Sequence, residues 1–207
     1  MPILDVSRLI FLIPAILIAL TVHEFAHARV AELMGDPTAR VAGRVSLNPT
    51  KHLDVTGSLL FLLVGFGWGK PVPINGRYFR NPRQGMLLVS LAGPGSNVIT
   101  AIVLSLAVRM LVAISSASVV TGYVVNVMVY AVFINVILAI FNLLPIPPLD
   151  GSKIFASLMP DAWLPTYLSF ERYGTLALFL AIVFFSSAVS RVMSPISDFL
   201  IKLLLPA

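Results

Sequence analysis

The composition is that of an integral membrane protein. Of the 207 residues, 58% are hydrophobic and only 11% are charged, whereas a soluble domain has about 25% charged and roughly 45–50% apolar residues. This balance excludes a soluble globular domain, and it also excludes disordered, collagen-like and coiled-coil chains. The formal net charge of +5 bears on membrane orientation rather than on nucleic-acid binding. Because cysteine is absent, any bound metal must be held by nitrogen and oxygen atoms.

Four apolar stretches approach the length of a membrane-spanning helix, which is about 20 residues for a hydrocarbon core about 30 Å thick. They comprise residues 9–33, 86–114, 119–144 and, at borderline length, 173–189. After Pro195, Asp198 and Lys202 are spaced as on an interfacial helix. The sequence therefore predicts an all-α polytopic membrane protein, a single domain over residues 1–207 with about four transmembrane helices and a C-terminal interfacial helix.

A fifth apolar run, residues 55–67, is too short to span a bilayer and fits a re-entrant or interfacial segment. It leads into residues 68–75, where Pro71 and Pro73 exclude a helix and favour extended, edge-type backbone. Non-helical backbone at membrane depth persists only where protein or a wet cavity satisfies its polar groups. We therefore expect a re-entrant, β-like loop that borders a cavity.

The loop charges predict the orientation in the cell membrane. Residues 29–83 contain eight basic residues and three acidic ones, whereas residues 115–118 contain no charge. Positively charged loops stay in the cytoplasm, so we expect the long loop and the 144–172 connection on the cytoplasmic side. An N-terminal signal peptide is a competing interpretation of Arg8 and the apolar run up to Ala28. Its cleavage would discard the most unusual residues of the chain, so we expect the segment to be retained.

His23 and His27 are four positions apart on a predicted helix, with Glu24 beside the first of them. Side chains at positions i and i+4 lie on the same helix face, so both imidazoles can reach one ion while Glu24 leans over its open position. This is the His-Glu-x-x-His pattern of zinc hydrolases. Two unrelated histidines are the alternative, but each ionisable group in a membrane span costs roughly 2.5–3.5 kcal/mol, which favours a functional site.

A catalytic zinc site needs three protein ligands, and the sequence offers two candidates for the third. His52 is the remaining histidine, but it lies in the basic loop. Asp150 follows a stretch whose prolines must end the third span, and Gly151 permits a sharp turn there. Because this turn and the histidine pair both fall near cytoplasmic helix ends, Asp150 is the better candidate. A simple turn residue before glycine is the alternative interpretation.

Three separated motifs resemble those of the site-2 proteases, the intramembrane zinc metalloproteases. They are residues 23–28 (HEFAHA), 92–97 (AGPGSN) and 142–151 (NLLPIPPLDG), in the order and spacing of that family. Residues 43–49 and 66–73 look like its compact branch. The likeness covers a core of about residues 8–155, followed by an additional helix and tail over residues 156–207. The chain differs from many members in having no room for a PDZ insertion and no CBS domains.

The resemblance implies a zinc-dependent endopeptidase that hydrolyses peptide bonds within or near transmembrane segments. One zinc ion per chain would be held by His23, His27 and Asp150, and Glu24 would be catalytic. The expected partners are a transmembrane protein substrate and the lipid bilayer but no nucleic acid, and the glycine-containing spans could support a homodimer. A catalytically silent scaffold is one alternative, against which the intact Glu24 argues. A metal transporter is the other, against which the absence of an internal repeat argues.

Five further residues are assigned on weaker grounds. Asn142 is a candidate second donor to the oxyanion of the reaction, with capping of broken backbone as the alternative. Val72 and Ile74 are expected to pair with an extended substrate as with an added strand. Asn97 is a candidate substrate contact, although its Gly-Pro-Gly surroundings favour an interhelical hydrogen bond. His52 is either a substrate-loop or supporting residue or a solvated loop histidine.

Overall fold

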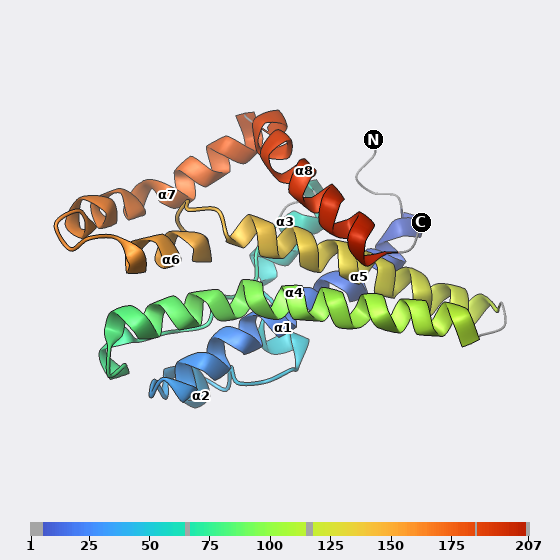
Figure 1. Cartoon of the computed structure of the whole chain (residues 1–207), viewed down its shortest axis with the longest axis horizontal. Coiled ribbons are helices and arrows are strands. Elements are labelled where there is room, and N and C mark those ends of the chain that lie inside the picture. Colours follow the sequence, from blue (N-terminus) through green and yellow to red (C-terminus); the bar gives the residue numbers. More distant parts are fainter. Residues whose placement is uncertain (1–5, 65–66, 115–117, 185, 206–207) are drawn as a thin grey trace.

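Three long helices form the centre of the molecule. The computed structural model describes residues 6–64, 67–114, 118–184 and 186–205. Its central helices are α1 (Val6–Leu33), α4 (Pro82–Ile114) and α5 (Val119–Asn142), and each of them packs against the other two (Figure 1). Within the described ranges, the structure contains no β-strand beyond one isolated bridge, so the predicted all-α fold is confirmed.

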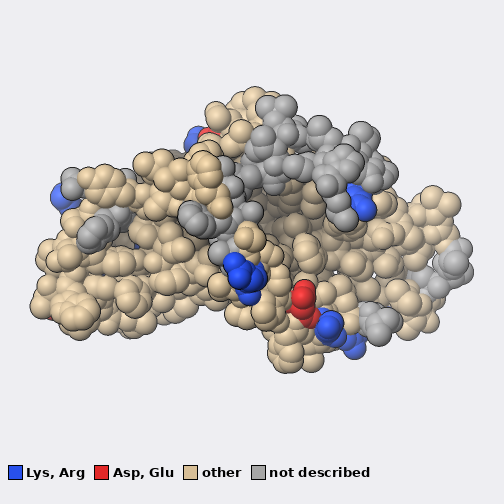
Figure 2. Space-filling view, turned by 90° about the horizontal axis from the view of Figure 1, so that it is seen from above, with Lys and Arg blue, Asp and Glu red and all other residues tan. Residues whose placement is uncertain are grey.

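The same three helices are long and apolar enough to cross a membrane, and no other helix within the described residues is. Between 22% and 28% of each apolar window is buried inside the protein, so most of these side chains face outward. On α4, exposed apolar residues include Ile99, Val103, Leu106 and Met110. Charged side chains occupy only a few positions on the face seen in Figure 2. A surface of this kind is covered by lipid rather than water, and the chain is a membrane protein.

The region of the predicted fourth span is divided between two helices, α7 (Leu164–Phe184) and α8 (Ser186–Leu204). The chain changes direction between them (Figure 1), so the predicted boundaries 173–189 are wrong. Serines at positions 186, 187 and 190 interrupt the apolar run where the second helix begins. α8 also starts well before Pro195, which lies inside the helix. A total of four spans and an interfacial depth for the C-terminal helix stay predictions.

Arg109 of α4 fastens the end of α8 to the bundle. Its guanidinium donates hydrogen bonds to the carbonyls of Leu203 (3.2 Å) and Leu204 (2.9 Å). The Ser105 hydroxyl also donates to the Leu204 carbonyl. Carbonyls in the last turn of a helix have no partner within it, so α4 supplies the donors that α8 lacks.

Short elements connect the long helices. The connection between α1 and α4 contains α2 (Thr38–Val41), the 3-10 turns η1 (Pro49–Lys51) and η2 (Gly76–Tyr78), and α3 (Val55–Val64). The described residues 67–75 are non-helical, and Gly69 forms an isolated bridge with Leu53, as expected of a β-like loop. After α5, a proline-rich turn leads into α6 (Asp150–Leu158), which packs against α4.

The close approach of α1 and α4 depends on Gly93. A Cβ atom at this position would lie 2.3 Å from His27 Nε2 and 2.7 Å from His23 Cε1. Gly95, on the same helix, has open space around it. Only glycine at position 93 therefore lets α4 pass directly against the two imidazoles.

We expect Gly93→Ala to destabilise the folded protein by about 1–3 kcal/mol, because the added methyl group overpacks the interface between α1 and α4. Gly95→Ala is the matched control, and it should be neutral or stabilising, since alanine favours a helix by up to about 1 kcal/mol over glycine. Thermal unfolding of both variants in detergent micelles measures the difference. Equal melting temperatures would contradict the close approach described here.

Candidate metal centre

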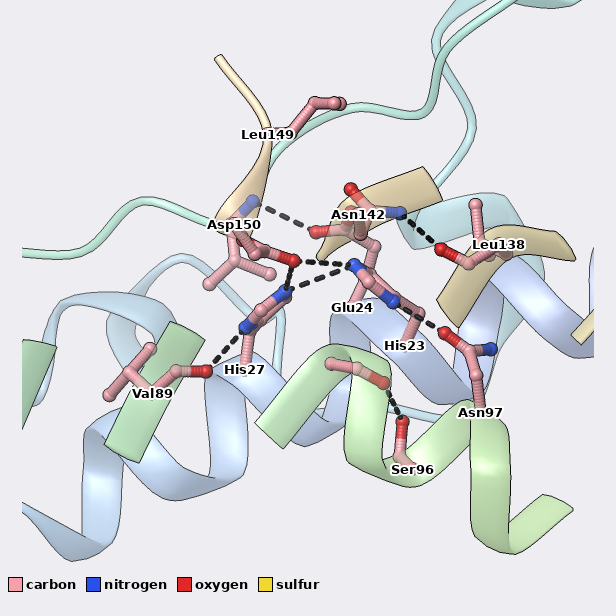
Figure 3. A network of polar contacts seen from close by, with 12 residues as sticks. His23, Glu24, His27, Val89, Ser96, Asn97, Leu138, Asn142, Leu149 and Asp150 are labelled. Carbon is pink, nitrogen blue, oxygen red and sulfur yellow. Dashed lines mark hydrogen bonds and ion pairs between the residues drawn. The ribbon is translucent and has the colours of Figure 1, made fainter. Parts of the chain in front are cut away.

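Three side chains from two distant parts of the chain, α1 and α6, meet inside the protein (Figure 3). His27 Nε2 lies 3.0 Å from His23 Nε2 and 3.0 Å from Asp150 Oδ2, and His23 Nε2 lies 3.1 Å from the same oxygen. All three residues are buried. Within the described part of the chain, no other group of three or more His, Cys, Asp or Glu residues is arranged to hold a metal ion.

The turn after α5 brings Asp150 to the histidines. Three prolines, at positions 145, 147 and 148, end the helical backbone, and Asp150 is the first residue of α6. Gly151 packs against the end of α5, because a Cβ atom there would lie 2.3 Å from the Leu143 carbonyl oxygen. A larger residue at position 151 would push α6 and its carboxylate away from α1.

Hydrogen bonds determine the tautomers of both histidines. His27 Nδ1 lies 2.7 Å from the carbonyl oxygen of Val89, which can only accept, so Nδ1 carries the proton. His23 Nδ1 lies 2.6 Å from Asn97 Oδ1 and donates to it in the same way. In the neutral imidazoles, both Nε2 atoms are then unprotonated. They direct lone pairs at each other and at the carboxylate oxygen.

Two buried asparagines orient the oxygen that accepts from His23. Asn97 Nδ2 donates to the Ala19 carbonyl (3.1 Å) and to Asn135 Oδ1 (2.7 Å), and Asn135 Nδ2 donates to the Ala131 carbonyl (2.8 Å). Because backbone carbonyls only accept, neither amide can be reversed. The network joins α1, α4 and α5 and holds His23 in one tautomer and one orientation, as outer hydrogen bonds do for metal-ligating histidines.

The separation of the three atoms fits a divalent cation. Three lone pairs at 3.0–3.1 Å with no proton between them repel one another unless a positive charge lies among them. In a tetrahedral site with bonds of about 2.0–2.1 Å to the metal, ligand atoms lie roughly 3.3 Å apart. Two imidazoles and one carboxylate are a donor set of catalytic zinc sites, which keep a fourth position for water or substrate.

The ionisation of Asp150 suits this role. Burial raises the pKa of its carboxyl, but in the absence of a metal a proton on the imidazoles places positive charge and a hydrogen-bond donor beside it, which outweighs burial and brings the pKa below the ordinary value. The carboxyl is therefore ionised at neutral pH. A metal binds the ionised carboxylate, not the acid.

A cavity of about 130 Å³ opens over these atoms. Glu24 lines it, and its Oε2 accepts a hydrogen bond from the backbone N–H of Val72 at 3.1 Å. Figure 3 shows the Glu24 carboxylate close to both His23 and Asn142. Val72, Ile74 and Asn142 line the same cavity. The structure thus gathers around one space the three candidate ligands, the candidate catalytic carboxylate and three of the residues assigned on weaker grounds.

The side chain of Asn142 lies at the end of α5, and its Nδ2 donates to the Leu138 carbonyl four residues back in the same helix (3.0 Å). This carbonyl is not among the last four of the helix, so capping of broken backbone stays a prediction. The residue also lines the cavity. An amide has two N–H donors, so the bond to Leu138 is compatible with a second one into the cavity.

Asn97 and His52 are not among the residues that line this cavity, so a contact of either with a substrate stays a prediction. Asn97 accepts the hydrogen bond of His23 Nδ1, on the edge of the imidazole ring opposite Nε2. His52 is fully buried, and its Nε2 lies 2.7 Å from the Ser46 carbonyl, so it is not a solvated loop histidine. The burial of a loop residue arises from tertiary contacts, which the composition of a basic loop does not reveal.

Two polar residues of the cavity, Ser90 and Lys153, were not predicted from the sequence. Ser90 is almost fully buried, and its hydroxyl has no hydrogen-bond partner among the described residues. Lys153 lies one helical turn after Asp150 on α6, and that spacing could have indicated it. A serine in an apolar helix carries no comparable signal.

Comparisons with known proteins identify the family of the chain. Residues 106–186 match the family described as Peptidase family M50. The chain is 39% identical over 185 residues to "Putative zinc metalloprotease YwhC" of Bacillus subtilis, a match that covers 86% of this chain and 82% of that relative. It is 32% identical over 176 residues to "Putative zinc metalloprotease Rip2" of Mycobacterium tuberculosis, covering 82% of this chain and 64% of the relative. No solved structure matches the chain.

The match to YwhC extends over most of both chains, which is sufficient to assign the family. The residues that meet at the cavity are those on which the resemblance to metalloproteases rests. The chain belongs to peptidase family M50, the site-2 protease family of metalloproteases.

Proposed function

We propose that this protein is a zinc-dependent intramembrane endopeptidase that cleaves transmembrane segments of other proteins. One observation carries the proposal: three lone pairs and the Glu24 carboxylate face the same cavity between helices with lipid-facing apolar surfaces. The names of the two relatives support zinc as the metal. His23, His27 and Asp150 would hold it.

The chain's own residues suit the hydrolysis of a peptide bond. Zinc, when bound, supplies Lewis acidity that polarises a carbonyl and brings the pKa of water to about 7. Glu24 takes the proton of the attacking water on its carboxylate and passes it to the leaving amine. The free N–H of Asn142 donates to the carbonyl oxygen of the substrate as negative charge develops there.

The substrate would bind in extended form along residues 72–75. A helix shields its own carbonyls, so a transmembrane substrate must unwind before it is cleaved. Val72 N–H is bonded to Glu24 and Asn75 N–H to Asp36, whereas Ile74 makes no backbone hydrogen bond to any described residue. The backbone of Ile74 is therefore where a substrate strand can pair.

The proposed site faces the cytoplasmic side of the cell membrane. Glu24 and both histidines lie in the second half of α1, toward the connection between α1 and α4, which lies within residues 29–83 with their eight basic residues. The positive-inside rule places such a connection in the cytoplasm.

We expect Glu24→Gln to retain about one zinc ion per chain and to lose cleavage of a single-span model substrate by about 10²–10⁴-fold, because the amide cannot transfer the proton. Zinc content by elemental analysis and cleavage in detergent check the two parts. Glu32→Gln is the control, since Glu32 lies on the same helix but pairs with Arg29 and Arg40 outside the cavity. Cleavage by Glu24→Gln at the wild-type rate would refute the assigned base, and zinc transport without cleavage would favour a transporter.

We expect Asn97→Ala to weaken zinc binding by about 10–100-fold, because His23 loses the acceptor that holds its tautomer and orientation. Competition with a chelator of known zinc affinity measures the change. Asn126→Ala is the matched control, since Asn126 lies exposed on α5 and donates only to the Gly122 carbonyl of its own helix. Wild-type affinity in Asn97→Ala would show that the buried network does not tune the site.

We expect a proline scan through the cleavage segment of a model substrate to reduce cleavage at alternating positions. Proline removes the N–H that an added strand would donate, and strand partners alternate with a period of two residues. An alanine scan at the same positions keeps the N–H groups and is the control. Undiminished cleavage of every proline variant would contradict strand pairing.

A further inference from the structure

Arg44 is a buried cation beside the non-helical segment 67–75, and the proposed reaction does not explain its role. Only 5% of this residue is exposed. It lies between α2 and η1, and its guanidinium donates to the carbonyls of Lys70 and Pro71, the latter at 3.2 Å. Within the described part of the chain, Arg44 forms no ion pair. A buried charge without a carboxylate at contact distance is unfavourable for stability, so its retention points to another role.

The Pro71 carbonyl and the Val72 N–H belong to the same peptide unit. Arg44 donates to the oxygen of this unit, and the N–H of the same unit, that of Val72, donates to Glu24 Oε2 at 3.1 Å. One peptide therefore links the guanidinium to the catalytic carboxylate. Because hydrogen bonds in a chain polarise one another, the cation on the carbonyl strengthens the bond from the N–H to Glu24.

His52 holds the other side of the same backbone. Its carbonyl accepts from Lys70 N–H at 2.8 Å, and Lys70's own carbonyl is bound by Arg44. His52 Nε2 donates to the Ser46 carbonyl, so its unprotonated Nδ1 faces Arg44 at 3.5 Å. The N–H and the carbonyl of Lys70 are therefore both hydrogen-bonded, directly before the Pro71–Val72 peptide that contacts Glu24.

We propose that Arg44 is a positioning residue that holds the Pro71–Val72 peptide against Glu24 and so sets the orientation of this carboxylate during peptide hydrolysis. The inference rests on the proposed protease function. Arginine suits the task because its planar fork can bind two neighbouring carbonyls at once, whereas lysine is a point charge on a flexible stem.

Cleavage kinetics test the proposal in the full-length, zinc-loaded protein. We expect Arg44→Gln to lower kcat for a single-span model substrate by about 10–100-fold, the range that a small misplacement of a catalytic group produces, with KM within about twofold of the wild type and zinc content unchanged. Arg44→Lys should recover only part of kcat. Arg77→Gln, an exposed arginine of the same connection, is the matched control and should behave as the wild type.

A spectroscopic measurement separates the inference from the protease function. The chain has no cysteine, so Lys70→Cys, at an exposed position, accepts a single nitroxide label. We expect an immobilised electron paramagnetic resonance spectrum with Arg44 present, and a mobile one when Arg44→Gln or His52→Gln is added. This readout needs no cleavage and includes a second variant should Arg44→Gln not fold.

The outcomes are distinguishable. A wild-type protein that binds zinc but never cleaves would refute the protease function, while the label would still test whether Arg44 holds the loop. An active wild type with unchanged kcat in Arg44→Gln would overturn the inference. So would a rise in KM alone, zinc loss in both Arg44 variants, or an unchanged label spectrum.

Discussion

Two imidazole nitrogens and one carboxylate oxygen face one another at 3.0–3.1 Å in the interior of this protein, and the hydrogen bonds on the far side of each ring leave lone pairs between them. Their repulsion is larger in a low-dielectric interior than in water. A bound cation removes it. Because one ligand comes from α6 and two from α1, docking of the proline-interrupted connection on the bundle is coupled to metal binding.

The helices are packed by the same groups that orient the ligands. Lipid gives no hydrophobic driving force between helices, so association in a membrane relies on small residues and interhelical hydrogen bonds. Gly93 supplies the close approach of α4 to α1, and Asn97 and Asn135 supply the hydrogen bonds that reach α5. The same contacts therefore pack the helices and orient the metal ligands, so a substitution that disturbs the packing also displaces the ligands.

Sequence reasoning succeeds here where the determinant is local. His23 and His27 share a helix face because of their spacing, and the prolines around Val72 exclude a helix from that segment whatever packs on it. It fails where the determinant is the packing of distant segments. His52 is buried among Ser46, Arg44 and Lys70, and Asn135 matters only because Asn97 lies opposite. The division of the last apolar run between α7 and α8 likewise depends on a change of direction that hydropathy does not encode.

The non-helical segment meets two requirements that a helix could not. A helix uses its N–H and C=O groups internally, whereas extended backbone leaves each of them for another partner. In residues 70–72 the partners are protein groups, namely His52, Arg44 and Glu24. At Ile74 the backbone is not engaged by any described residue. Each peptide unit of extended backbone finds its partners independently of the next. One short segment can therefore be held rigidly at residues 70–72, beside the Glu24 carboxylate, and still leave the backbone of Ile74 open to a substrate.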